Sequence, residues 1–264
     1  MEKQFKHTTE RKITRYEGGK FKEKEDVIAL EKPITIRINH TEFATLVCTP
    51  DHLEDMVIGF LASEGVIRSY HDVEEMLFND GQGIVNVKAA VQGSLTSDTY
   101  TKRVISSCCG KSRHFYLKSD SKTARTIMKA PKLTASVCLA NMRTLQEESA
   151  TFKSTGGVHN AAIFKNGEMV ASRTDIGRHN ALDKLYGYVL RHHLHPSDLS
   201  VAFSGRISSE VVIKLSKMGI GVLLSKSAPT ELAIQLADDL NITTVGFIRH
   251  EGFNVYTKPE RILN

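Results

Sequence analysis

Long apolar runs and cysteines are both scarce in this sequence. No apolar run approaches the ~20 residues that a membrane-spanning helix needs. The first 26 residues are too highly charged for a signal peptide, so we expect a soluble cytoplasmic protein that contacts no membrane. Only four cysteines occur among the 264 residues. In a reducing cytoplasm they are not expected to form structural disulfides.

The composition is otherwise that of a globular protein. Apolar residues make up 41% of the chain and charged residues 25%, which excludes the disordered and collagen-like classes. The length allows one large domain or two modest ones. The formal net charge of +5 is too small to indicate nucleic acid as a partner, but it is compatible with a local anion site.

The first half of the chain predicts a small α+β subdomain over residues 26–130. Residues 1–25 carry many charges and few apolar side chains, and they predict a loose arm. The apolar pattern then alternates as half-buried strands and changes to helical spacing after Pro50, which suits a first helical position. The expected elements are a strand pair at 33–38 and 43–48 joined by Asn39–His40, a helix beginning at 49–51, and a second strand pair at 84–91 and 99–105.

The rest of the chain predicts an α/β domain over residues 131–264. Asn166–Gly167 between two apolar runs is a strong signal for a hairpin with a type I′ turn. The last third alternates as βαβαβ, which implies parallel strands joined by right-handed crossovers. The expected helices are at 121–128, 136–148, 180–192, 208–218 and 229–240, and the expected strands are at 161–164, 169–172, 199–203, 220–224 and 243–248.

Three loops carry cations at the carboxyl ends of the parallel strands. They are residues 204–206, 225–229 and 249–252. Ligands of open parallel sheets bind beyond these strand ends, and the first two loops precede helix N-termini, whose free N–H groups attract anions. Each loop alone is typical of a solvated surface, and no phosphate-loop or dinucleotide fingerprint is present. Together, the three loops indicate a site for a phosphate-bearing ligand.

Two histidines lie in polar segments that border core elements. His159 and His179 could each be a metal ligand or a proton carrier, with Asp175 orienting one of them. Equally, each histidine could be an ordinary structural hydrogen bonder, and Asp175 could stabilise a helix N-terminus.

Cys108 and Cys109 follow a short apolar run and are flanked by basic residues. Zinc sites usually take pairs spaced C-x₂₋₄-C, and the chain has neither a second pair nor the H-x-E and P-C-x-x-C patterns of zinc deaminases, so no metal is expected. A disulfide between neighbours would be strained and labile. Both thiols could instead be buried as packing residues, but the flanking basic residues favour a thiolate and hence a reactive loop thiol. Cys48 and Cys138 are expected in the core.

Taken together, several motifs resemble the formate dehydrogenase accessory sulfurtransferase family, FdhD. They read EKPITIRINHTEFATLVCTPDHLEDMVIGFLASEGVI, SSCCGK, STGGVHNAAIF, RTDIGRHNALDKLYGY, SGRISSEVVIKLSKMGIGVLLSKSAPTELA and VGFIRHEGFNVYT. The resemblance implies a sulfur carrier that takes persulfide sulfur from a cysteine desulfurase and passes it to the molybdenum cofactor, before insertion into formate dehydrogenase. It implies an α/β fold with a cytidine deaminase-like mixed sheet, in which His159 stands at a helix entrance.

The resemblance also implies the site residues. It places the persulfide on Cys108, with Cys109 as the second candidate. Many members of the family carry C-x-x-C-G where this chain reads Cys108-Cys109-Gly110, which disfavours a mechanism that needs two spaced thiols. The substrate would be the cofactor in its molybdopterin guanine dinucleotide form, held first by Phe247, Ile248, Arg249, His250, Glu251 and Gly252, and second by Arg206 and Lys226.

The leading hypothesis is therefore an enzyme, a sulfurtransferase that acts through a cysteine persulfide. The alternative is a chaperone that carries the molybdenum cofactor to formate dehydrogenase without catalysis. Whether the protein is a homodimer stays open on the sequence alone.

Overall fold

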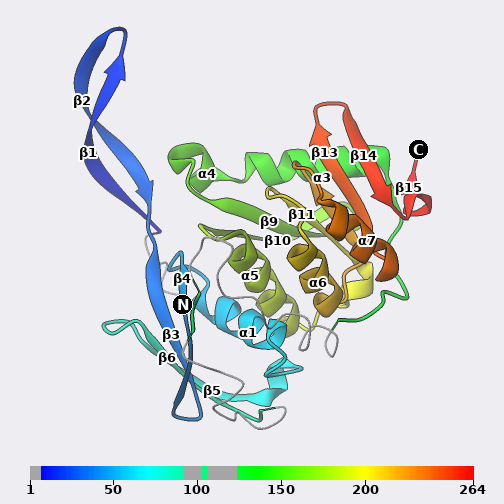
Figure 1. Ribbon diagram of the computed structural model, residues 1–264, viewed down its shortest axis with the longest axis horizontal. Coiled ribbons are helices and arrows are strands. Elements are labelled where there is room, and N and C mark those ends of the chain that lie inside the picture. The colour runs from blue at the N-terminus through cyan, green and yellow to red at the C-terminus, as the bar shows by residue number, and fades with distance from the viewer. Residues whose placement is uncertain (1–6, 92–102, 106–123) are drawn as a thin grey trace.

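The structure, a computed structural model, describes residues 7–91, 103–105 and 124–264. Two mixed sheets form its main bodies, and helices α1 and α5 lie between them (Figure 1). The helices are α1 (Leu53–Ser63), α3 (Ala135–Glu147), α4 (Ala150–Thr155), α5 (Arg178–Arg191), α6 (Ser209–Met218) and α7 (Glu231–Asp239). No helix in the described part of the chain is long and apolar enough to cross a membrane.

The first sheet has five strands in the order β5-β6-β3-β4-β7. The hairpin of β3 and β4 turns at Asn39 and His40, which both take positive φ values of 46° and 71°, as a two-residue I′ turn requires. The strands are β3 (Lys32–Ile38), β4 (Thr41–Cys48), β5 (Val73–Asn79), β6 (Ile84–Ala89) and β7 (Arg103–Ile105).

The second sheet has six strands in the order β10-β9-β11-β12-β13-β14. The central strands β11, β12 and β13 are parallel, which confirms the βαβαβ prediction, and the predicted Asn166–Gly167 hairpin joins β9 to β10. The strands are β9 (His159–Lys165), β10 (Glu168–Asp175), β11 (Leu199–Phe203), β12 (Val222–Ser225), β13 (Thr243–Arg249) and β14 (Gly252–Thr257). Short strands β8 (Leu133–Thr134) and β15 (Ile262–Leu263) pair beside this sheet.

Two hydrophobic clusters hold the described residues together. The larger cluster contains side chains of β3, β4, α1, α5, β11 and α6, so it is continuous between the two sheets. The smaller cluster joins α3 to strands β9, β11, β12 and β13. Helix α3 therefore covers the face of the six-stranded sheet opposite to α5 and α6.

The prediction of a loose N-terminal arm is wrong for the described residues after residue 7. Strands β1 (Thr8–Glu17) and β2 (Lys20–Ala29) form an antiparallel hairpin. Gly18 and Gly19 take the positive φ values that its tight turn needs. Charged residues run consecutively in both strands, at Glu10–Lys12 and Lys22–Asp26, so the alternation of apolar residues that usually reveals a strand is missing.

Three further expectations need correction. Residues 84–91 and 99–105 were expected to pair with each other, but β6 pairs with β3 and β5, and β7 pairs with β4. The helix expected at 49–51 begins at Leu53, because Thr49 and Asp51 are tied by hydrogen bonds to Lys184 instead. Residues 124–128 of the expected helix at 121–128 are not helical, since the backbone of Ile127 bonds to Leu240 and Asn241.

Candidate functional site at the strand ends of the six-stranded sheet

The carboxyl ends of β11, β12 and β13 lie at one edge of the six-stranded sheet. Their parallel pairing brings the three predicted loops together at this edge. The amino end of β9 joins them because β9 runs antiparallel to β11, with Ala161 opposite Phe203. The amide of Asn160 and the hydroxyl of Ser204 are hydrogen bonded at 2.9 Å. We call this edge, with its loops, the rim.

A pocket of about 400 Å³ lies on the rim between α3 and the ends of β12 and β13. Its lining combines an apolar floor with cationic and polar side chains: Leu139, Met142, Arg143, Gln146, Lys226, Ile248, Arg249 and His250. Arginine forks and a lysine ammonium are the groups that bind phosphate oxygens. The side chains present therefore fit a ligand that has a phosphate group and an apolar or planar part.

The backbone around Arg249 explains how this segment presents its side chains. Phe247 and His250 both take positive φ values, and the pairing of β13 with β14 is irregular between Gly246 and Arg249. As a result Ile248 is buried while Arg249 and His250 are exposed. The Arg249 guanidinium lies over the Phe247 ring, 5.7 Å from its centroid.

The pocket includes only part of the predicted cofactor-binding set. Ile248, Arg249, His250 and Lys226 line it, whereas Phe247, Glu251, Gly252 and Arg206 are not among its lining residues. Each of these four is exposed, and Arg206 lies on the neighbouring loop of the rim after β11.

Serine side chains hold two of the rim loops to each other. The Ser225 hydroxyl donates to the Gly205 carbonyl at 2.8 Å and accepts from the Ser227 amide at 3.0 Å. The Ser227 hydroxyl donates to the Ser204 carbonyl at 3.1 Å. These buried and half-buried bonds fix the loops before any ligand arrives, which reduces the entropy that binding would cost.

Polar atoms at the starts of α5 and α6 also lie at the rim. The Arg178 Nε and the Ser208 Oγ are buried and have no hydrogen-bond partner within the described residues. Buried polar atoms of this kind are rare in native structures. The rim therefore has unused hydrogen-bonding capacity beyond the pocket itself.

The two candidate histidines lie near these atoms. Burial first, and then the nearby Arg178 guanidinium, lower the pKa of His159 below its ordinary value, so His159 is neutral at physiological pH. His159 is the first residue of strand β9 and not at a helix entrance. That expectation is wrong because Gly156 ends α4 in the left-handed conformation, and the apolar run after His159 continues as a strand. His179 stands at the start of α5, with its Nε2 2.8 Å from the Glu210 carboxylate on α6.

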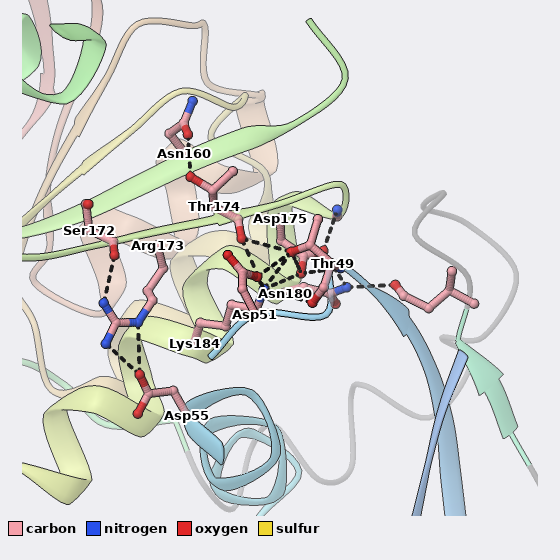
Figure 2. Close-up of polar contacts among 12 residues, drawn as sticks. Thr49, Asp51, Asp55, Asn160, Ser172, Arg173, Thr174, Asp175, Asn180 and Lys184 are labelled. Atoms are coloured by element: carbon pink, nitrogen blue, oxygen red, sulfur yellow. Dashed lines mark hydrogen bonds and ion pairs between the residues drawn. The ribbon is translucent and has the colours of Figure 1, made fainter. Parts of the chain in front are cut away.

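Asp175 belongs to a buried polar network that links the two sheets (Figure 2). Its carboxylate accepts bonds from the amide and hydroxyl of Thr49 at 3.0 and 2.9 Å. It also accepts from the Gly177 amide and the Asn180 side chain, at 2.8 and 2.9 Å, and lies 2.8 Å from the Lys184 Nζ. With both oxygens occupied in this way, Asp175 holds the start of α5 in place, and no histidine is among these partners.

The predicted thiols fall in two groups. Cys108 and Cys109 lie outside the described residues. Cys48 and Cys138 are both fully buried, as predicted, and burial raises the pKa of Cys48 to about 12 and that of Cys138 to about 11. Neither buried thiol ionises near neutral pH. Within the described residues, no group of three or more His, Cys, Asp or Glu side chains is arranged to hold a metal ion.

Sequence reasoning missed the contribution of α3 to the pocket. Arg143 and Gln146 line it from this helix, and the Lys226 Nζ lies 3.3 Å from the Gln146 Oε1. The spacing of Leu139, Arg143 and Gln146 places them on one side of the helix, which was the available signal. Nothing in the sequence says that this side faces a strand end 80 residues further along the chain.

Comparison with known proteins places the chain in one family. The family model of the FdhD/NarQ family matches residues 29–263. The sulfur carrier protein FdhD of Geobacillus kaustophilus is 54% identical over 253 residues, which are 96% of each chain. That of Bacillus subtilis is 52% identical over 257 residues, covering 97% of this chain and 98% of the relative.

A solved structure agrees with these sequence matches. The crystal structure of a candidate formate dehydrogenase accessory protein from Desulfotalea psychrophila matches with a TM-score of 0.80 and 26% identity. The match covers 97% of this chain and 99% of the other. The chain therefore belongs to the FdhD/NarQ family.

Proposed function

We propose that this protein is a sulfur carrier that matures formate dehydrogenase, acting as a sulfurtransferase on the molybdenum cofactor. The cation-lined pocket on the rim is the observation that carries the proposal. It supplies a place for a phosphate-bearing substrate in a chain whose relatives are named sulfur carriers. The substrate form that suits three cations and an apolar floor is the molybdopterin guanine dinucleotide.

The chemistry is carried by Cys108, with Cys109 as the second candidate. The Cys108 thiolate attacks the outer sulfur of a persulfide on a cysteine desulfurase. The sulfur–sulfur bond of the donor breaks, the donor leaves as a thiolate, and Cys108 becomes a persulfide. The outer sulfur of the Cys108 persulfide then passes to the cofactor: the sulfur–sulfur bond breaks, Cys108 leaves as the thiolate, and a thiol reductant supplies the two electrons that bring the transferred sulfur to the sulfide level. The basic residues around Cys108 in the sequence favour the thiolate that the first step needs.

The order of elements in the six-stranded sheet supports a cytidine deaminase-like fold for residues 131–264. An antiparallel hairpin, β9 and β10, is followed by α5 and then by the parallel unit β11–α6–β12. In this arrangement His179, and not His159, is the histidine at the helix entrance. The part of the chain that the structure describes brings no metal-ligating cluster to this position, so we propose a binding role for the rim in place of deamination.

Intact-mass spectrometry tests the proposal directly. After incubation with a cysteine desulfurase and cysteine, the wild-type protein and the Cys109→Ala variant should gain one sulfur, and Cys108→Ala should gain none. Cys108→Ala should also abolish formate dehydrogenase maturation in cells, while Cys109→Ala retains part of it. Normal maturation by Cys108→Ala with loss in Cys109→Ala would reverse the assignment. Normal maturation by a variant that lacks both thiols would favour the non-catalytic cofactor chaperone.

A further inference from the structure

The hairpin of β1 and β2 projects from the body of the molecule (Figure 1). Neither hydrophobic cluster of the described residues contains a residue of this hairpin, although β2 contacts α4 near its base. The family model begins at residue 29, where the hairpin ends. A two-stranded hairpin is only marginally stable in water, so a hairpin of this length without a core beneath it is typical of a segment that a partner covers.

The two faces of the hairpin carry opposite charge. Residues directly opposite each other in the register share a face, so the face of each side chain follows from the pairing. One face, which we call the basic face, presents the cations Arg11, Arg15, Lys20, Lys22 and Lys24 with the carboxylates Glu17 and Asp26; the other presents Lys12 with Glu10, Glu23 and Glu25.

The carboxylates of the hairpin neutralise only part of the basic face. Arg11 and Lys20 stand opposite Asp26 and Glu17, but Arg15 stands directly opposite Lys22, and like charges in this position destabilise a pair of strands. The Arg15 guanidinium reaches Glu17 only at 3.7 Å, and both side chains are more than half exposed. The five exposed cations outnumber the two carboxylates of this face. A net positive charge is therefore available to an acidic surface.

The tip of the hairpin carries an exposed aromatic pair on the face opposite the basic one. The Tyr16 and Phe21 rings are tilted against each other with their centroids 5.1 Å apart, and they are 64% and 74% exposed. The register places them with Glu23 and Glu25. The basic face therefore has to recognise a partner by charge.

The base of the hairpin lies at the end of the sheet where β7 ends. Lys32, at the start of β3, pairs with Cys48, and Ile105, the last residue of β7, pairs with Leu46. The chain enters β3 from the hairpin and leaves β7 at this same end of the five-stranded sheet, and Cys108 follows Ile105 three residues later in the sequence. The pocket on the rim belongs to the other sheet. A partner on the hairpin therefore stands at the end of the sheet at which β7 ends.

We propose that the hairpin is a docking arm for an acidic surface of the enzyme that donates sulfur, the cysteine desulfurase. This inference rests on the proposed function and adds the surface that recognises the donor. The basic face steers and orients the donor.

A charge-reversal experiment on the full chain tests this docking arm. The test variant is Lys22→Glu with Lys24→Glu, both on the basic face. The matched control is Lys12→Glu with Lys132→Glu, which changes the net charge equally but alters the other face of the hairpin and an exposed position elsewhere. The second-order rate of sulfur loading is measured with a persulfidated cysteine desulfurase and, separately, with cysteine persulfide as a small donor.

We expect the test variant to load about 10-fold more slowly from the desulfurase, because steering by charge commonly changes association rates by that factor or more. Loading from cysteine persulfide should match the wild type in both variants, and only wild type and control should slow steeply with salt. Equal desulfurase rates in test and control variants would overturn the docking arm. A fall in oligomeric mass confined to the test variant would also overturn it, by assigning the arm to a second copy of this chain. If the wild type loads from neither donor, the proposed function itself fails.

Discussion

The buried ammonium of Lys184 is held by a set of oppositely charged and polar partners. Lys184 is fully buried, and its ammonium contacts the carboxylates of Asp51 and Asp175 and the hydroxyl of Thr49. Burial alone would lower the pKa of Lys184, but the two carboxylates outweigh it and raise the pKa. A buried ion costs several kcal/mol unless it is paired in this way. The ammonium therefore joins the β4–α1 connection to α5.

Replacing Lys184 with methionine should destabilise the fold strongly. The substitution leaves two carboxylates facing each other without a cation, and breaking a buried pair from one side costs about 3–5 kcal/mol. Urea unfolding measures the change, with the exposed Lys165→Met as the control, which should stay within about 0.5 kcal/mol of wild type. An unfolding midpoint for Lys184→Met equal to that of the control would contradict the structural role of the network.

The stability that Asp51 contributes should depend on pH. Burial opposes its ionisation, but the Lys184 ammonium and the Thr49 hydroxyl hold the pKa of Asp51 below its ordinary value. A group whose folded pKa is lowered stabilises the fold above its unfolded pKa, and this contribution is lost as the pH falls through the folded pKa. The stability difference between wild type and Asp51→Asn should thus be full near neutral pH and shrink as the pH falls below about 4, the ordinary pKa of an aspartate. A difference that stays constant over this range, measured by urea unfolding, would exclude the ion pair as its source.

At the scale of elements, the crossing of α1 and α5 joins the two sheets. Gly59 and Gly187 lie where the helices meet. A Cβ on Gly59 would stand 1.8 Å from the Asp183 carbonyl oxygen, and one on Gly187 would stand 1.9 Å from that of Asp55. Because the obstacle is backbone, no side-chain rotation can relieve it. Only glycine permits the two helices to approach this closely.

Gly187→Ala should therefore force α1 and α5 apart. Overpacking of this kind typically costs about 1–3 kcal/mol and sometimes more, and here the loss should lie at or above the upper end. The control is Gly81→Ala, whose nearest atom would be the Asn79 Oδ1 at 3.8 Å, and it should unfold with the wild type. Thermal and urea unfolding measure the stability of both variants. A Gly187→Ala protein with unchanged stability would show that the crossing is looser than its geometry indicates.

At the scale of the whole molecule, the two sheets carry different parts of the proposed function. The five-stranded sheet ends with β7 shortly before Cys108, whereas the pocket lies on the six-stranded sheet against α3. The larger hydrophobic cluster links the sheets through α1 and α5. The division of the chain at residues 26–130 and 131–264 stays a prediction.

This separation predicts that cofactor binding and sulfur loading can be uncoupled. Arg249→Glu reverses a charge in the pocket, and a charge-assisted contact is worth about 1.5–3 kcal/mol, so guanosine diphosphate should bind about 10-fold to 100-fold more weakly. Sulfur loading on Cys108 should keep its normal rate. Arg68→Glu is the control, because Arg68 is exposed and is not among the residues that line the pocket. Arg206→Glu should have a smaller effect, because Arg206 does not line the pocket.

Calorimetry for the nucleotide and mass spectrometry for loading on the same preparations separate the outcomes. Unchanged affinity in Arg249→Glu would mean that the rim charges are merely solvated. Loss of both properties would indicate one shared site.

Local patterns in the sequence determined several elements of the fold and the position of part of the candidate site. Asn166–Gly167 specified its hairpin because both residues accept positive φ, and the alternation over residues 199–248 specified parallel strands because crossovers have one favoured hand. Because the carboxyl ends of parallel strands meet at one edge of a sheet, this order also placed Lys226 and Arg249 at the same edge of the six-stranded sheet. The burial of Cys48 and Cys138 followed equally from their apolar surroundings.

Only the tertiary structure decided which distant segments meet. It placed Arg143 and Gln146 of α3 over the ends of β12 and β13, and it paired β7 with β4 in place of β6. It also decided that Asp175, which could have oriented a histidine or stabilised a helix N-terminus, is the centre of a buried network at the start of α5. The physical reason is that periodicity reports which face of an element is buried, whereas the partner of that face depends on packing between elements far apart in the chain.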